Sequence, residues 1–140
     1  MKYLLDTCIV SEFVAASPEK RVLTWLDGVD ERTLWLSVLT IGELSKGIEK
    51  LPQSKRRATL ALWLDHDLLM RFEGRIAVLD TETLLLWGKL CARLEKLGSP
   101  MPAIDSLIAA SALHADCTLV TRNTQDFQHA GVQLFNPWID

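Results

Sequence analysis

Four acidic residues lie where predicted strands end or where the helices after them begin, so they are placed to do chemistry together. Asp6 comes directly after the apolar run Tyr3–Leu5, and Asp126 lies just beyond a later apolar run. Glu43 and Asp105 lie in the first turns of predicted helices. Because the carboxyl ends of parallel strands meet at one edge of a sheet, where ligands bind, we expect these side chains to converge there.

A cluster of carboxylates favours a divalent cation. Several negative charges in one place repel one another, so such a site is stable only with cations present or with raised pKa values. Oxygen-only ligands suit the hard ions Mg²⁺ and Mn²⁺. These ions activate bound water and neutralise the charge of a phosphodiester under in-line attack. This chemistry needs no histidine or cysteine nucleophile, and none is well placed in the sequence.

Small and hydroxyl-bearing residues surround the predicted site. Thr40 and Gly47 lie one turn either side of Glu43 and leave its face open. Thr7 and Thr121 place hydroxyl groups near strand ends, where they can hold metal-bound waters or orient carboxylates. These residues favour a metal site over a solvated surface.

Each acid also has an ordinary structural explanation. Asp6 could cap the first helix, and Glu43 could pair with Lys46 three residues on. Asp105 could favour a helix N-terminus, and Asp126 could serve turn geometry. The joint placement of the four acids after successive strands favours a shared site.

The hydrophobic pattern predicts strands that alternate with helices. We expect strands at residues 3–5, 33–36, 75–79, 117–121 and, at an edge, 132–135. We expect helices at residues 7–15, from an N-cap at Ser17 to about Leu26, from after 36 to before Pro52, at 54–72, at 81–97 and at 103–115, with a short helical turn at 124–127. This alternation predicts an α/β fold, a parallel-sheet α/β/α sandwich, formed by a single domain spanning residues 1–140.

Composition limits the class of protein. Hydrophobic residues make up 49% and charged residues 24% of the 140 residues, which is typical of a soluble globular domain. No apolar run reaches the about 18 residues that a membrane span needs, so we expect no membrane partner and a cytoplasmic location. Three scattered cysteines argue against disulfides or a zinc knuckle. The net charge is −3, so contact with nucleic acid must come from local basic patches and metal ions.

The chemistry-bearing segments resemble the successive motifs of a known family. Leu4–Glu12, Glu43, Ala103–Ala110 and Thr121–Phe127 look like the motifs of a PIN domain, and the similarity covers essentially the whole chain. The closing segment Phe135–Trp138 resembles the FitB-like branch of the VapC toxins. The resemblance implies a PIN-like fold.

The resemblance also implies an activity and partners. Proteins of this kind are toxins of type II toxin–antitoxin pairs: Mg²⁺- or Mn²⁺-dependent endoribonucleases that cut RNA and arrest translation. They usually form homodimers and are silenced by a small antitoxin, whose tail covers the active site and whose other end binds operator DNA. We therefore expect a cognate antitoxin and an RNA substrate, with operator DNA bound only through the antitoxin.

Position by position, the resemblance makes Asp6, Glu43 and Asp105 the metal-binding acids. We expect Asp6 and Asp105 to hold the principal ion and Glu43 to share it or position the attacking water. A fourth acid often occupies the position of Asn123 in such proteins, and here Asp126, one helical turn on, can substitute as the fourth catalytic acid. Many relatives also have Asn where this chain has Cys8.

Two other functions that use an acid after the first strand do not fit this sequence. An aspartyl phosphatase needs a second Asp two residues after the first, where this chain has Cys8, and a receiver domain needs a Lys where it has Thr121 and Arg122. A DNA-directed nuclease of the same fold and a catalytically weak binding module are the remaining alternatives. A comparison of RNA cleavage with DNA cleavage distinguishes the DNA-directed nuclease from the ribonuclease. Growth arrest that Asp6→Asn relieves distinguishes the ribonuclease from a binding module.

Overall fold

Five parallel strands form one sheet with β1 at its centre, in the computed structural model, which describes residues 1–140. The strand order is β3-β2-β1-β4-β5, and every neighbouring pair is parallel. The strands are β1 (Lys2–Leu5), β2 (Leu34–Ser37), β3 (Ile76–Ala77), β4 (Cys117–Val120) and β5 (Leu134–Phe135). Because the strands run in one direction, all of their carboxyl ends lie at one edge of the sheet, and the predicted parallel sheet is confirmed.

The central strands bury both of their faces. Leu4 pairs in register with Leu119, and Leu5 with Val120. The first pair belongs to one hydrophobic core and the second pair to another, since successive side chains of a strand point to opposite faces. Strands buried on both faces have continuous apolar sequences, which is why a run of three apolar residues predicted β1.

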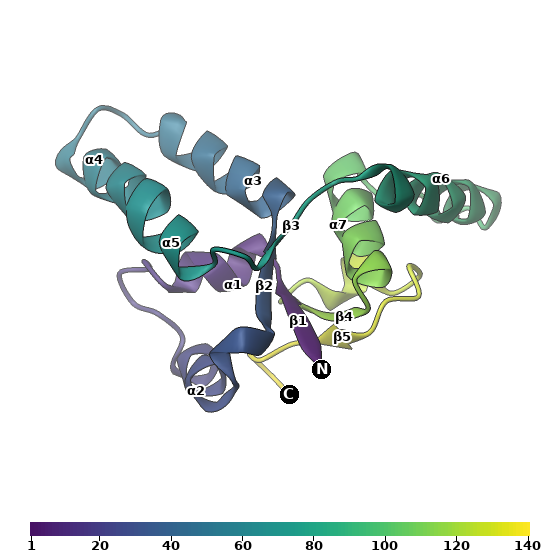
Figure 1. Cartoon of the computed structure of the whole chain (residues 1–140), viewed down its shortest axis with the longest axis horizontal. Helices are drawn as coiled ribbons and strands as arrows, with labels where there is room; N and C mark the ends of the chain where they lie inside the picture. Colours follow the sequence, from purple (N-terminus) through teal and green to yellow (C-terminus); the bar gives the residue numbers. More distant parts are fainter.

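Helices cover both faces of the sheet and produce the predicted α/β/α sandwich (Figure 1). Helices α6 and α7 pack on the face that carries Leu4, while α1, α2, α3 and the segment from α4 to α5 pack on the face that carries Leu5. The helices are α1 (Thr7–Glu12), α2 (Lys20–Gly28), α3 (Val38–Glu49), α4 (Lys55–Leu62), α5 (Leu69–Arg71), α6 (Thr81–Lys96) and α7 (Ala103–His114), with short 3₁₀ turns at Glu31–Thr33 and Thr124–Phe127. None of these helices combines the length and apolar character required to span a bilayer.

Some predicted boundaries are wrong. Helix α1 ends at Glu12 rather than at residue 15, and α2 begins at Lys20 rather than after a cap at Ser17. The backbone N–H of Glu19 donates to the Glu12 carboxylate (N–O 2.9 Å), which holds this connection extended. Strand β3 is shorter than the predicted 75–79, because its partner β2 ends at Ser37, where the serine side chain caps α3.

The predicted helical stretch 54–72 is helical but not uniform. Residues Trp63–Leu68 form a π-helical segment between α4 and α5. The buried Leu64, Leu68 and Phe72 lie four residues apart, so this segment keeps one apolar stripe on the sheet. The long helix predicted from that stripe is therefore present, with a local widening of its turns.

Helix α7 lies close to the sheet because its inner face is made of small residues. Ala109, Ala110 and Ala112 are fully buried, and Ser111 is almost so. Ser106, also on this buried face, accepts a hydrogen bond from the indole N–H of Trp87 on α6 (N–O 2.8 Å). This packing fixes the start of α7 at the carboxyl edge of the sheet.

Candidate active site

Asp6 lies directly after β1 and is held by two hydrogen bonds. It is 8% exposed. One carboxylate oxygen accepts the backbone N–H of Thr7 (2.8 Å), and the other accepts the hydroxyl of Thr121 (2.8 Å). Asp6 therefore caps α1, the ordinary structural role that its position allows. The two bonds also fix the orientation of its carboxylate at the end of the central strand.

Thr121 joins the ends of three neighbouring strands. Its backbone N–H donates to the carbonyl of Phe135 at the end of β5 (3.0 Å). Its hydroxyl, fully buried, donates to Asp6 and accepts the backbone N–H of Asn123 (3.0 Å). The Asn123 side chain is exposed and makes no capping bond to the turn that follows.

Glu43 is connected to Asp6 through a single threonine. The hydroxyl of Thr7 donates to a carboxylate oxygen of Glu43 (2.6 Å) and lies 3.3 Å from the hydroxyl of Thr40. The backbone N–H of the same Thr7 binds Asp6. The alternative pairing of Glu43 with Lys46 does not occur, since Glu43 takes part in no ion pair.

Asp105 responds electrostatically to the other three acids. It lies in the first turn of α7 and is half-buried. Burial raises the pKa of its carboxyl, and the negative charges of Asp6, Asp126 and Glu43 raise it further. Asp105 therefore lies in the same part of the molecule as the other three acids, at the edge of the sheet where the strands end.

Three hollows open around these acids. Asp105 and Asp126 border a cavity of about 280 Å³ together with His129 and the proline-rich loop 99–102. Glu43 borders two more, of about 480 and 360 Å³. Three of the four acids therefore border hollows at the surface, whereas Asp6 lines none of these three.

Comparison with protein families matches residues 3–132 to the PIN domain. The chain belongs to the PIN-domain family. It is 33% identical to VapC ribonuclease Y4jK from Sinorhizobium fredii over 96% of each chain, and 34% identical to Toxin FitB from Neisseria gonorrhoeae over 98% of this chain and 99% of that protein. The crystal structure of FitAcB from N. gonorrhoeae superposes with a TM-score of 0.94, at 33% identity over 99% of each chain. The resemblance to PIN domains and to the FitB-like branch is confirmed.

The donor set of this PIN domain fits a hard divalent cation by its chemistry. Its acids supply only oxygen ligands, and no Lys, Arg or His forms an ion pair with any of the four. The thiol of Cys8 lies 3.9 Å from the Asp6 carboxylate, but burial raises the pKa of that thiol and keeps it protonated. No three Asp, Glu, His or Cys side chains are drawn together closely enough to hold a metal ion. The four acids are therefore neighbours at the edge of the sheet and do not form a closed ligand set.

Two contacts near the carboxyl edge of the sheet were not predicted. The hydroxyl of Thr7 was expected to support the site, but its bond to Glu43 depends on how α3 packs beside α1. The guanidinium of Arg122 lies over the ring of Trp138 (5.2 Å), a contact that no sequence pattern indicates. The sequence indicates the bond between Thr7 and Glu43 only by an Asp-Thr pair at a strand end and a Glu much later in the chain.

Repulsion within the cluster leads to a stability prediction. We expect Asp105→Asn to raise the free energy of unfolding of the metal-free PIN domain at neutral pH. Because the pKa of Asp105 is raised in the folded state, its protonated form stabilises the fold at low pH, and this stability is lost as the pH rises through the folded pKa. The increase in the free energy of unfolding caused by Asp105→Asn should thus be largest at neutral pH and vanish in acid.

Urea unfolding in the presence of a chelator, at neutral pH and at a pH below the usual aspartate range, measures this effect. Replacing the exposed Asp65 with Asn serves as the control, because Asp65 lies outside the cluster and should give no such gain. A variant that is less stable than the parent at neutral pH would contradict the repulsion argument.

Proposed function

We propose that this PIN domain is the toxin of a type II toxin–antitoxin pair and a Mg²⁺- or Mn²⁺-dependent endoribonuclease. The observation that carries this proposal is the bonding at the end of β1, where Thr7 and Thr121 bind the buried Asp6 and Thr7 also binds Glu43. Neither acid has a basic partner. The names of the relatives support it, since one is called a ribonuclease and another a toxin.

The chain's own residues would prepare the site for phosphodiester hydrolysis. Asp6 and Asp105 would hold the principal ion, and Glu43 would share it or position the attacking water. The ion supplies positive charge against the phosphate and lowers the pKa of its bound water. The bonds from Thr7 and Thr121 hold the Asp6 carboxylate in place, so little reorganisation is needed during reaction.

On the far side of the site, Asp126 with Asn123 would support the substrate or a second ion. Both residues are exposed beside β4, in the segment that Thr121 anchors to Asp6. Because Asn123 carries no charge, Asp126 provides the only negative charge on this side.

We infer that the protein acts together with a small antitoxin. FitAB bound to an IR36 DNA fragment superposes with a TM-score of 0.92 at 32% identity, over 97% of this chain and 95% of that one. VapBC2 from Rickettsia felis, at 27% identity and a TM-score of 0.81, is bound to a DNA fragment from its promoter. We therefore propose a homodimer that joins its antitoxin in a larger complex, touches operator DNA through the antitoxin and acts in the cytoplasm.

Metal removal tests the proposed function directly. We expect purified protein to cut RNA with Mg²⁺ or Mn²⁺, to lose this activity in EDTA and to regain it when the ion is restored, because the acids cannot neutralise a phosphodiester themselves. Labelled RNA and single-stranded DNA of the same sequence would be incubated side by side, with Asp6→Asn protein as a check for contaminating nucleases.

The outcomes separate the candidate functions. RNA cleavage that resists EDTA contradicts the metal mechanism. Equal or preferred cleavage of DNA identifies the DNA-directed nuclease, and RNA binding without cleavage under any metal identifies the binding module.

A further inference from the structure

A row of residues on one face of α3 leads away from the acids. Glu43, Lys46 and Lys50 are spaced by three and four residues, which places them on the same side of the helix. All three line the cavity of about 480 Å³. Neither lysine takes part in an ion pair, whereas Glu49 on the same helix pairs with Arg57. The cavity therefore begins at a site acid and carries two lysines without ion-pair partners, which outnumber the single carboxylate of Glu43.

The floor of this cavity is open helix backbone. Gly42 and Gly47 line it, and a Cβ built on either glycine would meet no atom within 4 Å. Glycine inside a helix costs about 1 kcal/mol relative to alanine. Close packing does not require these glycines, and the helix backbone is open to the cavity at both positions.

The opposite wall of the cavity belongs to α7. Ile104, which lies directly before Asp105, lines the cavity and is 42% exposed. Val38 and Leu39 at the start of α3 add apolar surface. The cavity thus lies between the helix that carries Glu43 and the helix that carries Asp105, next to the place where a scissile phosphate would be held.

We propose that this α3 cavity binds the nucleotides of the RNA strand that flank the cleaved phosphodiester. Lys46 and Lys50 contact neighbouring phosphates, and the apolar wall at Ile104 and Leu39 receives a sugar or base. This inference rests on the proposed function and adds to it the path of the substrate.

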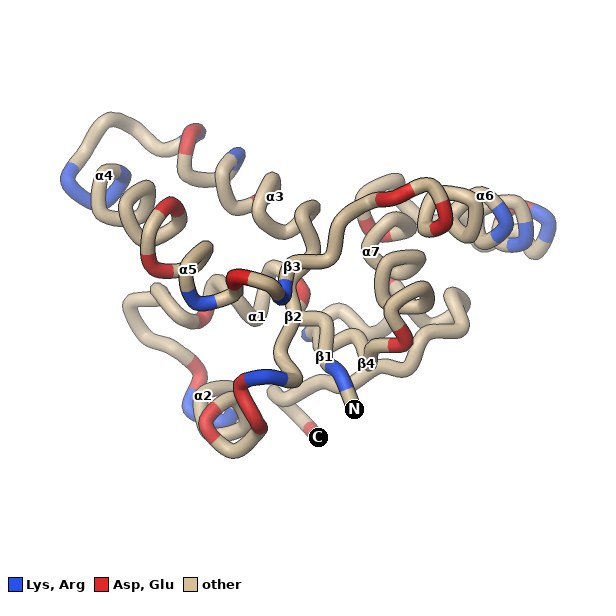
Figure 2. Tube along the Cα trace, in the orientation of Figure 1, with Lys and Arg blue, Asp and Glu red and all other residues tan.

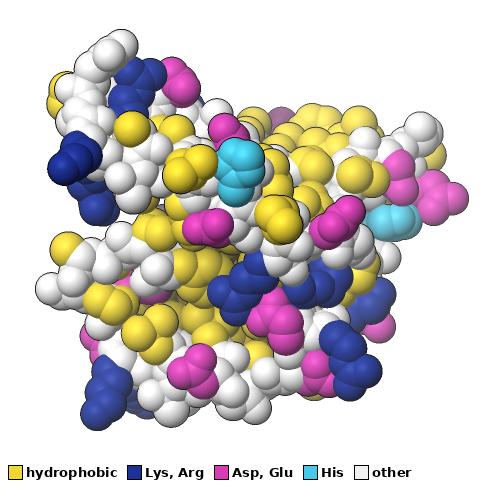
Figure 3. Space-filling view, turned by 60° about the vertical axis from the view of Figure 1, so that its left-hand side comes forward, with side chains coloured by type: hydrophobic (Ala, Val, Ile, Leu, Met, Phe, Trp, Pro, Cys, Tyr) yellow, Lys and Arg dark blue, Asp and Glu magenta, His cyan; other side chains and the backbone are white.

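Charge supports RNA as the occupant. The chain has a net charge of −3, and basic side chains form separate groups rather than one continuous face in the view of Figure 3. Figure 2 shows Lys or Arg on the outer part of α3 and at the start of α4. A phosphate backbone that approaches four carboxylates needs local cations to offset repulsion. Lys46 and Lys50 line the α3 cavity together with Glu43, whereas a single cation, Arg56, lines the other cavity that Glu43 borders.

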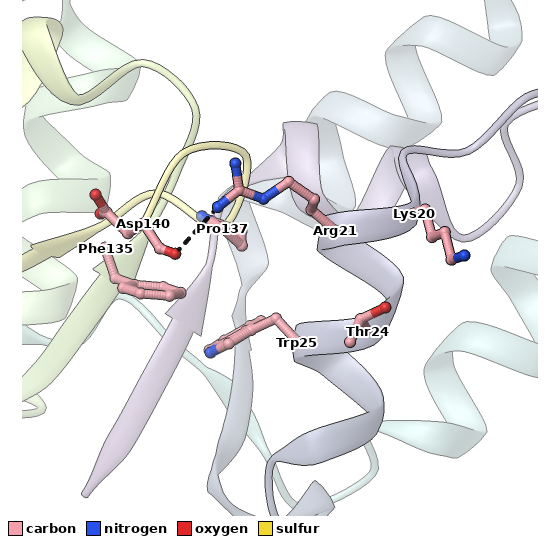
Figure 4. Close-up of a pocket in the computed structure, with 7 residues that line it drawn as sticks. All are labelled: Lys20, Arg21, Thr24, Trp25, Phe135, Pro137 and Asp140. Carbon is pink, nitrogen blue, oxygen red and sulfur yellow. Dashed lines mark hydrogen bonds between the residues drawn. The ribbon is translucent and has the colours of Figure 1, made fainter.

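A second basic cavity provides a matched control. Lys20 and Arg21 on α2 line a cavity of about 370 Å³, where the rings of Trp25 and Phe135 lie 5.1 Å apart (Figure 4). Arg21 donates there to the main-chain carbonyl of Asp140 (3.5 Å). This cavity contains two basic side chains but none of the four acids.

RNA binding as a function of salt concentration tests the inference. In the Asp6→Asn background, affinity for a short labelled single-stranded oligoribonucleotide would be measured by fluorescence anisotropy. The double variant Lys46→Gln, Lys50→Gln should weaken RNA binding by roughly tenfold or more. It should also reduce the salt slope, the slope of log affinity against log salt concentration, by about 1.4, since each lost phosphate contact removes about 0.7. Lys46→Arg with Lys50→Arg should keep the slope, and Lys20→Gln with Arg21→Gln should leave affinity and slope unchanged.

A variant without any charge change fills the cavity itself. Gly42→Leu introduces a side chain into open space in a helix that favours leucine, so the fold should persist and thermal stability should not fall. We expect it to weaken RNA binding while the salt slope stays near that of the parent.

The outcomes distinguish this inference from the proposed function. Unchanged affinity in both the double glutamine variant and Gly42→Leu overturns the α3 path, even if the parent enzyme cuts RNA. An equal loss in the Lys20 and Arg21 control also overturns it, because the effect would then reflect total charge. A parent protein that neither binds nor cuts RNA overturns the proposed function first.

Discussion

Asp6→Asn is expected to lower the rate of RNA cleavage by roughly a thousandfold or more, which corresponds to about 4 kcal/mol of transition-state stabilisation. Asp6 is the most buried of the four acids and the one at the end of the central strand. An amide in its place keeps the shape but removes the charge that would attract the cation. Expression of the parent should arrest growth, and the variant should relieve that arrest.

The fold should survive this substitution because asparagine can make the same structural bonds. Its amide oxygen can still accept the backbone N–H of Thr7, and asparagine is as good an N-cap as aspartate. The amide N–H can donate to the hydroxyl oxygen of Thr121 in place of accepting from it. A loss of activity would then report on chemistry, and circular dichroism with urea unfolding checks the fold.

A matched substitution guards against a general charge effect. Asp27→Asn removes one negative charge from the exposed surface of α2 and should leave both cleavage and growth arrest as in the parent. Full RNase activity of Asp6→Asn in a nuclease-free preparation would show that the convergent acids are not the catalytic site.

The sequence predicted the location of the site better than its internal contacts. Asp6 was singled out because a short apolar run that ends in an acid marks a buried parallel strand and its carboxyl end. Asp126 was singled out because it lies a few residues beyond a later apolar run. Parallel topology then requires such ends to meet, whatever the length of chain between them. The raised pKa of Asp105 agrees with this argument, since burial is its largest cause and the charges of Asp6, Asp126 and Glu43 add to it.

Contacts that depend on how helices pack against each other could not be predicted from the sequence pattern. The bond from Thr7 to Glu43 joins residues 36 positions apart, and it forms only because α3 passes beside α1. The α3 cavity likewise needs Ile104 of α7 opposite Lys46. The start of α2 was also predicted wrongly: the connection from α1 is held by the bond from the Glu19 N–H to the Glu12 carboxylate, and no cap forms at Ser17.

The second large expected effect concerns the anchor beneath Asp126. Phe127→Ala should lower the free energy of unfolding by about 3–5 kcal/mol, the usual cost of truncating a buried phenylalanine. Phe127 is 1% exposed and packs in the core with Leu119 and Ala130. A domain of this size is stable by only about 5–15 kcal/mol, so the variant should be near its unfolding limit at elevated temperature.

The same substitution should affect the site, because Asp126 belongs to the 3₁₀ turn that Phe127 fixes to the core. In protein that remains folded at low temperature, we expect weaker cleavage, since a carboxylate on a loosened turn is held less well against the other acids. Urea unfolding and cleavage rates below the melting temperature would be measured on the same preparation. Phe127→Leu leaves a smaller cavity and should lose less of both. If Phe127→Ala keeps full activity while it loses stability, Asp126 acts independently of its turn, and catalysis depends on the acids of β1, α3 and α7 alone.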